Sequence, residues 1–416
     1  MRACTIIFGF ALLITSFTAD DAEAQPKGFN YDESKIPAYT LPELLVMRDG
    51  TKVTKPEQWP ARRKEILDLY EDQVFGKLPA PQPVKIVKQH PTHAIEHGSV
   101  EQFTLRIGND QVYHDLPVVL FLPKSDKPVP VFLGYNFPGN HTVSSDPQLV
   151  INGPEPTDPK HARGASASRW QIEEVLKRGY GVVTACYQDL APDNGKTFRT
   201  GVHRLFGAAN EGELGANECS AIGAWSWGLS RIFDHLETDK RIDAKRVIVH
   251  GHSRLGKTSL WAGATDPRYA IVISNNSGEG GAAITRRRFG ETITRINTSF
   301  PHWFCGNYKQ YNEQEDKLPV DAHMLIALAA PRPVYVASAV EDTWADPRGE
   351  FLGAFHAGPA YRLFGKDVLE SEKMPEIDKP VQTTIGYHIR TGKHDITLYD
   401  WQQYMDFADK HLGKAK

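Results

Sequence analysis

The stretch "RVIVHGHSRLGK" at residues 246–257 decides the fold of this chain. An apolar run ends at Gly251-His252-Ser253, and the "LGKTSLWAGA" that follows is typical of a helix. A buried strand that turns sharply into a helix at a serine is the nucleophile elbow of serine hydrolases. Gly256 comes one residue later than in G-x-S-x-G, where a glycine allows the helix to pack closely on the sheet. The alternative is that Ser253 only caps the helix.

Buried strands alternate with helices on both sides of this elbow. Short apolar runs predict strands at residues 129–136, 180–188, 246–251, 268–276 and 332–342. Helical patterns cover residues 59–70, 170–179 and 216–237. The alternation predicts an α/β fold whose mainly parallel sheet is covered on both faces, and period-two segments at 101–108 and 113–123 predict antiparallel strands before it. We expect a single domain over residues 25–416, beginning with an extended arm at 25–60.

The first residues have the pattern of an export signal. Arg2 precedes an apolar span at residues 3–19, and Ala22-Glu23-Ala24 is a small-x-small cleavage pattern. We therefore expect residues 1–24 to be removed as a signal peptide, and the mature protein to be secreted or periplasmic. The alternative is an uncleaved membrane anchor, although the apolar span is shorter than the roughly 20 residues that cross a bilayer.

The charge balance is close to neutral. The chain has 48 Lys and Arg against 51 Asp and Glu, a net charge of −3. The predicted signal peptide carries one positive and three negative side chains, so its removal leaves a net charge of −1. Without a basic excess to displace counterions from phosphates, nucleic acid is excluded as a partner. No membrane partner is expected after cleavage.

The cysteines and histidines suggest neither a disulfide scaffold nor a metal site. One of the four cysteines falls in the predicted signal peptide, which leaves Cys186, Cys219 and Cys305 and allows at most one disulfide. His250 and His252 stand two residues apart, as metal ligands can, but no third ligand is apparent nearby. We expect no metal and no organic cofactor.

Two cations follow the predicted nucleophile. The backbone N–H of Arg254 is in the place of the usual oxyanion donor of such elbows, and its guanidinium can add charge to the same site. Lys257 comes four residues after Ser253, so a helix that begins there places both side chains on one face. The alternative is that both cations are solvated helix charges.

A serine nucleophile also needs a base and an orienting acid, which follow it in the order acid then histidine in hydrolases of this type. The predicted strand at 332–342 ends on Glu341 and Asp342, and sheet enzymes place catalytic groups at the carboxyl ends of strands. His394 lies in a polar loop and suits the base. His388 alternates with apolar neighbours and reads as a strand residue.

The elbow "GHSRLGK" resembles the G-C-S-R-x-G-K signature of glucuronoyl esterases, carbohydrate esterase family 15. The resemblance extends over most of the chain from about residue 60 and includes "YNFPGNHT" (135–142), "TACYQDLAPD" (184–193), "GAWSWGLSR" (223–231), "NTSFPHWF" (297–304) and "EDTWADPRGEFLGAFHAGPAYRLFG" (341–365). It implies an α/β-hydrolase fold, a three-layer αβα sandwich. It also implies hydrolysis of the ester between 4-O-methyl-glucuronic acid on xylan and an alcohol of lignin.

The resemblance implies roles for individual residues. Ser253 would be the nucleophile and His394 the base of an acyl-enzyme mechanism, with Arg254 assisting the oxyanion. Lys257 and Trp344 match positions that hold the glucuronoyl ring. Glu291 is a weaker match to a polar sugar-binding position.

Three other functions remain as alternatives. A secreted peptidase on the same fold would need an extended groove. An acetyl-xylan or other carbohydrate esterase on the same fold would share every catalytic feature. A non-catalytic carbohydrate-binding relic would keep aromatic platforms such as Trp303 and Trp344 but lose the triad.

The chain departs from the fungal members of that family in two places. Fungal members place the catalytic acid in a Q-E-S-G-like stretch, whereas "SNNSGEGG" here has Asn276 where the glutamate would stand. Asp342 resembles the acid site of bacterial members, and Glu279 is the alternative if the loop is shifted. His252 and Asp395 replace two cysteines that form a disulfide in fungal members.

Overall fold

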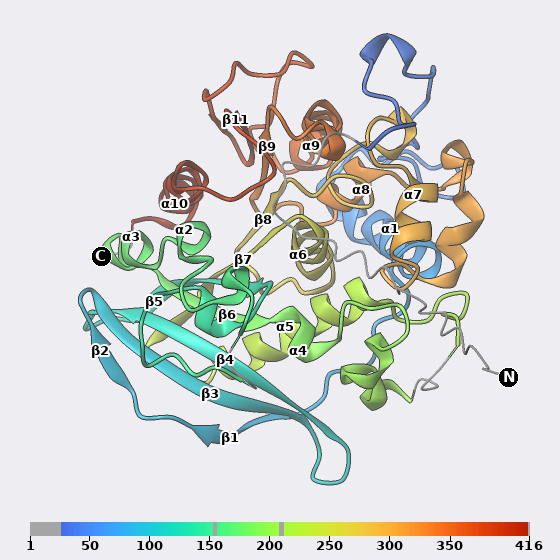
Figure 1. The fold of residues 1–416 in the computed structure, drawn as a ribbon. Helices are drawn as coiled ribbons and strands as arrows, with labels where there is room; N and C mark the ends of the chain where they lie inside the picture. The colour runs from blue at the N-terminus through green and yellow to red at the C-terminus, as the bar shows by residue number, and fades with distance from the viewer. Residues whose placement is uncertain (1–25, 153–155, 208–211, 415–416) are drawn as a thin grey trace, which may run out of the picture.

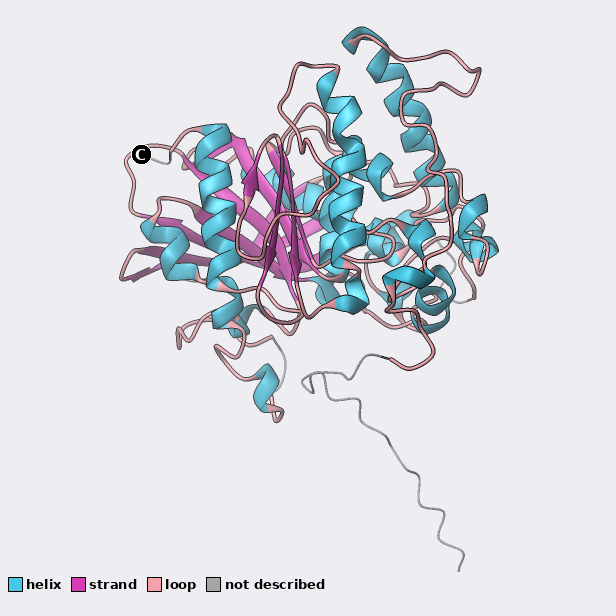
Figure 2. Ribbon diagram, turned by 90° about the horizontal axis from the view of Figure 1, so that it is seen from above, coloured by secondary structure: helices cyan, strands magenta, loops and turns pink. Residues whose placement is uncertain are grey.

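A computed structural model describes residues 26–152, 156–207 and 212–414, so the predicted signal peptide lies outside the described residues. An eleven-stranded sheet runs through this part of the chain, with helices on both of its faces (Figures 1 and 2). Ten strands follow the order β1-β3-β4-β6-β5-β7-β8-β9-β11-β10, and β2 pairs with β3. The strands are β1 Val84–Gln89, β2 His93–Ile95, β3 Gly98–Gly108, β4 Tyr113–Pro123, β5 Val129–Asn136, β6 Gly181–Cys186, β7 Ile242–His252, β8 Ile271–Asn275, β9 Val334–Ala339, β10 Val381–Gln382 and β11 Ile385–Arg390.

The six strands from β6 to β11 along this order pair in parallel, while β1, β3 and β4 on one side and β10 on the other pair antiparallel. The predicted mostly parallel sheet with an antiparallel start is thus confirmed. Side chains of the central strands alternate between two apolar clusters. In β5, Val131 and Leu133 face one cluster and Phe132 faces the other. A strand buried on both faces reads as a continuous apolar run in the sequence.

Helices cover each face of the sheet. One face carries α1 Trp59–Gln73, α5 Ala221–Leu236, α6 Arg254–Thr265, α8 Ala322–Ala327 and α9 Pro347–Arg362, and the other carries α2 Ala167–Trp170, α3 Ile172–Lys177 and α10 Leu398–Leu412. The short helices α4 Tyr187–Leu190 and α7 Ile293–Ser299 pack with the first group. No helix among residues 26–152, 156–207 and 212–414 is long and apolar enough to cross a membrane.

Two predicted helices differ from the observed ones. The helix expected at 170–179 is broken at Gln171, which has a φ of +47°, so α2 and α3 are separate. The helix expected from residue 216 begins at Ala221, because Ser220 caps it by accepting a hydrogen bond from Gly223 N at 3.1 Å. The preceding residues instead bond to the segment after α1, where Lys77 N donates to the carbonyl of Asn217 at 3.0 Å.

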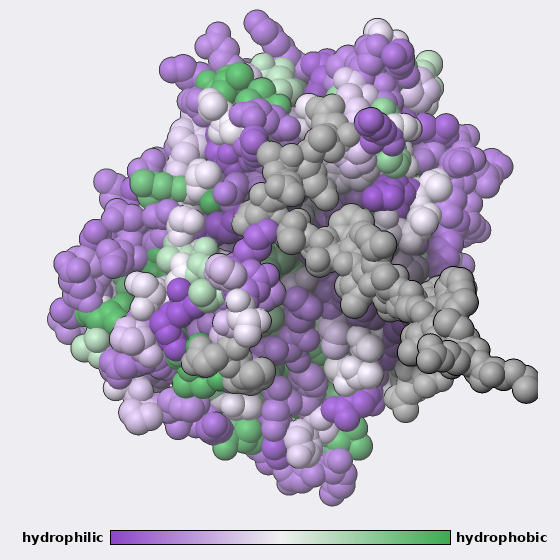
Figure 3. Space-filling model, in the orientation of Figure 1, coloured by the Kyte–Doolittle hydropathy of each residue, from purple (hydrophilic) through white to green (hydrophobic). Residues whose placement is uncertain are grey.

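Residues 26–58 form neither an α-helix nor a strand, and contain the short 3-10 helices η1 Glu33–Lys35 and η2 Pro56–Gln58. The segment, which is drawn in blue in Figure 1, lies beside α7, α8 and α9. On the face seen in Figure 3 hydrophilic side chains predominate and hydrophobic ones form small groups. The thiols of Cys186, Cys219 and Cys305 are all free and buried.

Candidate active site

Ser253 stands at the turn between β7 and α6. Its φ of +58° and ψ of −129° are dihedrals that L-residues rarely adopt, as expected of a nucleophile elbow. The turn is held by Ser253 N donating to the carbonyl of Asn275 at 2.8 Å, and by Gly256 N donating to the carbonyl of Ser253 at 2.8 Å. The serine side chain makes no capping hydrogen bond, so the interpretation of Ser253 as a plain helix cap is wrong.

The two glycines of the elbow explain its unusual spacing. A Cβ on Gly251 would lie 1.9 Å from the carbonyl oxygen of Leu255, so no other residue fits there. A Cβ on Gly256 would lie 3.0 Å from Cβ of Ser277 and 3.1 Å from the carbonyl oxygen of Asn275. The second glycine therefore serves the close approach of α6 to the end of β8, one residue later than in G-x-S-x-G.

His394 and Asp342 form a hydrogen-bonded pair next to this elbow. His394 follows β11, Asp342 follows β9, and Nδ1 of the histidine lies 2.6 Å from Oδ2 of the aspartate. Asn276 donates to the same Oδ2 at 2.6 Å. Burial alone would raise the pKa of Asp342, but the charge and hydrogen bond of His394 and the Asn276 bond lower it. An ionised Asp342 that accepts from Nδ1 leaves the lone pair of the imidazole on Nε2, as a general base requires.

The imidazole of His394 also lies next to the elbow. Its ring centroid is 4.5 Å from that of His252, the residue before Ser253, and its side chain is 41% exposed. His252 is held in place by Asn275, with 2.6 Å between Nδ1 and Oδ1. Burial and the neighbouring His394 keep the pKa of His252 well below its ordinary value, so its ring is neutral.

Glu279 and His388 lie away from this pair. Glu279 Oε1 accepts from Tyr308 at 2.6 Å and from Thr285 at 3.1 Å, inside the core, and burial raises its pKa to about 8. The structure therefore joins His394 to Asp342 and does not bring Glu279 to it. His388 is buried in β11 and bonds to Asp400 at 2.9 Å.

The guanidinium of Arg254 is engaged by a residue that sequence reasoning missed. Its Nη1 donates to Oδ2 of Asp193, and the indole of Trp303 lies 4.7 Å from its central carbon. Asp193 ends the stretch "TACYQDLAPD", but nothing in that stretch marks the aspartate as a partner of the elbow.

Lys257 and Glu291 form a buried ion pair near Trp303, whose ring centroid lies 6.0 Å from Lys257 Nζ. Lys257 Nζ lies 3.7 Å from Oε2 of Glu291 and donates to the carbonyl of Ser277, and its side chain is 4% exposed. Burial lowers the pKa of Lys257 and raises that of Glu291. Two polar groups taken out of water beside the elbow have hydrogen-bonding capacity that a polar ligand can use.

Trp344 lies in the 3-10 helix η10 Thr343–Ala345, which begins directly after Asp342. Its backbone is hydrogen-bonded to that of Glu291. Its carbonyl accepts from Glu291 N at 3.0 Å. Gly290, with a φ of +63°, permits this contact, because a Cβ there would lie 2.4 Å from the carbonyl oxygen of Trp344. The ring of Phe29 meets the indole of Trp344 edge-on, with 5.0 Å between centroids.

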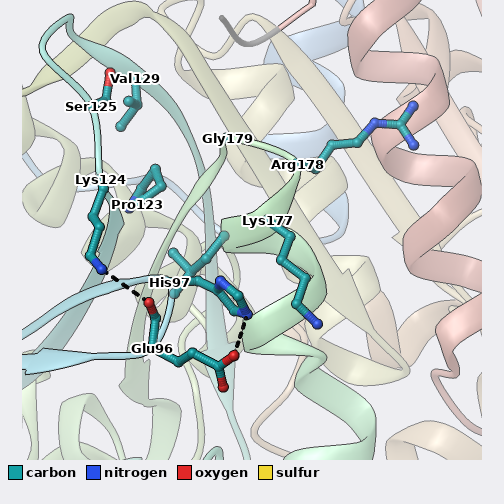
Figure 4. A pocket seen from close by; sticks show the side chains of 10 residues that line it. Glu96, His97, Pro123, Lys124, Ser125, Val129, Lys177, Arg178 and Gly179 are labelled. Carbon is teal, nitrogen blue, oxygen red and sulfur yellow. Dashed lines mark hydrogen bonds and ion pairs between the residues drawn. The ribbon is translucent and has the colours of Figure 1, made fainter.

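A cavity of about 410 Å³ opens at the opposite ends of the strands from Ser253. It is lined by the turn before β3, the loop before β5 and the end of α3 (Figure 4). There Lys124 donates to the carbonyl of Glu96 at 3.2 Å, and His97 lies 3.4 Å from the Glu96 carboxylate. These segments precede β5 and β6, so the cavity is at the amino ends of the parallel strands. Sheet enzymes place their chemistry at the carboxyl ends, where Ser253 lies.

Comparison with known proteins identifies the family. Residues 170–365 match the family model described as glucuronyl esterase, fungi. A carbohydrate esterase from an unknown prokaryotic organism is 47% identical, over 99% of this chain and 98% of its own length. The chain belongs to carbohydrate esterase family 15, the glucuronoyl esterases. It is a carboxylic ester hydrolase, as the resemblance to this family implied.

Solved structures of this family share the fold. A promiscuous esterase of the family from the marine bacterial metagenome has a TM-score of 0.85 and 47% identity, and covers 92% of this chain and 100% of its own. A glucuronoyl esterase from Solibacter usitatus has a TM-score of 0.85 and 44% identity, over 91% of this chain and 100% of its own. The predicted α/β-hydrolase fold is thereby confirmed.

Proposed function

We propose that this esterase hydrolyses 4-O-methyl-glucuronoyl esters that link the glucuronic acid of xylan to alcohols of lignin. The observation that carries the proposal is the contact of 2.6 Å between His394 and Asp342, beside a strained Ser253. A fungal relative from Schizophyllum commune, 26% identical over 88% of this chain and 82% of its own length, is a 4-O-methyl-glucuronoyl methylesterase. Family membership and site geometry support the same reaction class.

The proposed mechanism uses a triad of Ser253, His394 and Asp342. Ser253 Oγ attacks the ester carbonyl while Nε2 of His394 takes its proton, and Asp342 stabilises the imidazolium. The negative charge on the carbonyl oxygen is met by the backbone N–H and the side chain of Arg254. The alcohol leaves with the proton from His394, and a water activated by the same imidazole then releases the acid.

Lys257, Glu291 and Trp344 are proposed to bind the glucuronoyl ring. The buried ion pair offers a donor and an acceptor to sugar hydroxyls, and the indole offers an apolar face or its N–H. A site built around such polar groups rejects an ester that lacks the hydroxyls, because its own groups are then left unpaired. This is how a serine esterase of ordinary chemistry acquires preference for a uronate.

The setting proposed for this reaction is outside the cytoplasm. Cleavage before Gln25 would release a mature chain of residues 25–416, which we propose acts as one catalytic domain in the periplasm or after secretion. Its substrate is polymeric glucuronoxylan esterified to lignin.

The proposal is tested by hydrolysis of a benzyl ester of glucuronic acid by wild-type protein and by Ser253→Ala. We expect turnover by the wild type and a loss of at least about 10³-fold in the variant. An acetylated xylo-oligosaccharide is measured alongside, because the marine metagenome relative is described as promiscuous. Turnover of the acetyl ester alone would replace the glucuronoyl assignment with an acetyl-xylan esterase, and activity equal in Ser253→Ala would exclude the triad.

A further inference from the structure

The carboxylate of Asp193 collects four side-chain donors next to the elbow. Oδ2 accepts from Arg254 and from the hydroxyl of Tyr187, the latter at 2.8 Å. Oδ1 accepts from His302 Nε2 at 2.8 Å and from Trp303 Nε1 at 2.7 Å. The Asp193 side chain is 6% exposed. Four donors on a buried carboxylate fix its position, and three of them come from segments other than α6.

Arg254 is the member of this cluster that adjoins the nucleophile. The rings of Trp303 and Phe300 lie 4.7 Å and 5.5 Å from its central carbon, and that of Phe137 lies 5.9 Å away. Aromatic rings pack against a guanidinium but do not choose which way its planar N–H groups point. A hydrogen bond to one nitrogen does, because the five N–H donors form a rigid fork. Asp193 is the carboxylate that makes this bond.

Asp193 is ionised where it meets Arg254. Burial alone would raise the pKa of this carboxyl, but the His302 hydrogen bond, the charge of Arg254 and the Trp303 and Tyr187 hydrogen bonds outweigh burial and lower it. The pair Arg254–Asp193 therefore carries no net charge. Any help that the guanidinium gives to a developing oxyanion comes from the direction of its N–H groups and not from an excess positive charge.

We propose that Asp193 is a positioning residue of the esterase reaction, which acts through Arg254 by holding its guanidinium in the orientation that meets the oxyanion. The proposal rests on the proposed function in that Arg254 supports the oxyanion of the acyl-transfer step. The variant Asp193→Asn distinguishes two effects that change kcat in opposite directions. Removing a nearby negative charge favours an oxyanion and would raise kcat, whereas releasing the guanidinium lowers kcat.

The test is a double-mutant cycle on benzyl glucuronate with Asp193→Asn, Arg254→Ala and the double variant. We expect Asp193→Asn to lower kcat by about 10- to 100-fold with KM within about threefold, and Arg254→Ala to lower kcat by about 100-fold or more. The double variant should be no worse than Arg254→Ala alone, within about threefold, because Asp193 then has nothing to orient. Losses that multiply, or a kcat raised by Asp193→Asn, would overturn the proposal.

Controls separate this proposal from stability and from the substrate assignment. Asp189→Asn changes a carboxyl group of the same segment and should leave kcat unchanged, because the side-chain hydrogen bonds of Arg254 go to Asp193 and to the hydroxyl of Tyr187. If Asp193→Asn does not fold, Trp303→Phe removes one donor and keeps a ring, and its smaller loss should vanish in the Arg254→Ala background. If the wild type is inactive on benzyl glucuronate, the proposed function fails. The same cycle on 4-nitrophenyl acetate, which forms the same kind of oxyanion, then decides the role of Asp193.

Discussion

Two regions of the candidate site are built in different ways. The proposed catalytic region, Ser253, Asp342 and His394, lies at the carboxyl ends of β7, β9 and β11. The proposed recognition region, Lys257, Glu291 and Trp344, combines the first turn of α6 with loops that reach Phe29 in the N-terminal segment. Parallel strands fix the first region through sheet hydrogen bonds, whereas contacts between loops fix the second. We therefore expect that reaction chemistry and substrate preference can be changed separately in this protein.

The largest expected effect falls in the catalytic region. Asp342→Asn should lower kcat on benzyl glucuronate by about 10⁴-fold, because an amide at this place holds the imidazole in the wrong tautomer and cannot stabilise its charged form. Thermal unfolding should show that the variant still folds. The rate constants are measured under substrate saturation.

The neighbouring amide provides a sharper version of this experiment. Asn276 Nδ2 lies 2.6 Å from Oδ2 of Asp342, so Asn276→Asp in the Asp342→Asn background returns a carboxylate close to His394. We expect part of the lost kcat to come back. If Asp342→Asn retains kcat within tenfold of the wild type, the acid of the triad lies elsewhere.

A smaller effect, on KM, is expected in the recognition region. Lys257→Met keeps the volume of this buried side chain but leaves Glu291 without its cation. KM for benzyl glucuronate should rise by about 10- to 100-fold, since a hydrogen bond to a charged group contributes about 1.5–3 kcal/mol. The measurement compares this ester with 4-nitrophenyl acetate, for which KM and kcat should stay within threefold.

The matched control for Lys257→Met is Lys245→Met, an exposed lysine on β7 ahead of its buried part. Lys245→Met should change neither KM nor kcat for either ester. If Lys257→Met loses activity equally on both esters, the lysine stabilises the elbow and does not bind the sugar.

The same contrast explains what could be predicted from the sequence. The elbow is local, since a buried strand, Gly251 and Ser253 lie within one short stretch, and the histidine and acid follow strand ends. The hydrogen bond between Asp193 and Arg254 joins residues 61 apart, and the ring contact between Phe29 and Trp344 joins segments that are still farther apart in the chain. No periodicity records such pairings, because they depend on where loops meet after the sheet has formed.

A weaker effect is expected from the N-terminal segment. Phe29→Ala removes the ring that meets Trp344 edge-on at 5.0 Å, a contact of a kind that contributes about 0.5–1.5 kcal/mol. KM for benzyl glucuronate should rise by about two- to tenfold with kcat nearly unchanged, measured by initial rates. Tyr113→Ala, an exposed aromatic residue of β4, is the control. A fall in kcat with constant KM would mean that the segment supports the catalytic region instead.

The smallest effect on activity is expected at Glu279, a buried carboxyl group whose hydrogen bonds do not involve His394. Glu279→Gln should leave kcat within about twofold, because its bonds go to Tyr308 and Thr285. Burial raises its pKa from 4.5 to about 8, so between these values the folded protein keeps a proton that the unfolded chain releases. The free energy of unfolding therefore falls as pH rises through this window, by at most about 1.4 kcal/mol per pH unit from this group.

Glu279→Gln removes that contribution, so its urea midpoint should decline less than that of the wild type between pH 5 and pH 8. Glu341→Gln, an exposed carboxylate at the end of β9, should keep the wild-type slope. An unchanged slope in Glu279→Gln would show that this carboxyl is already ionised at neutral pH. A large loss of kcat would instead place Glu279 in the catalytic region and end the separation between Glu279 and Asp342.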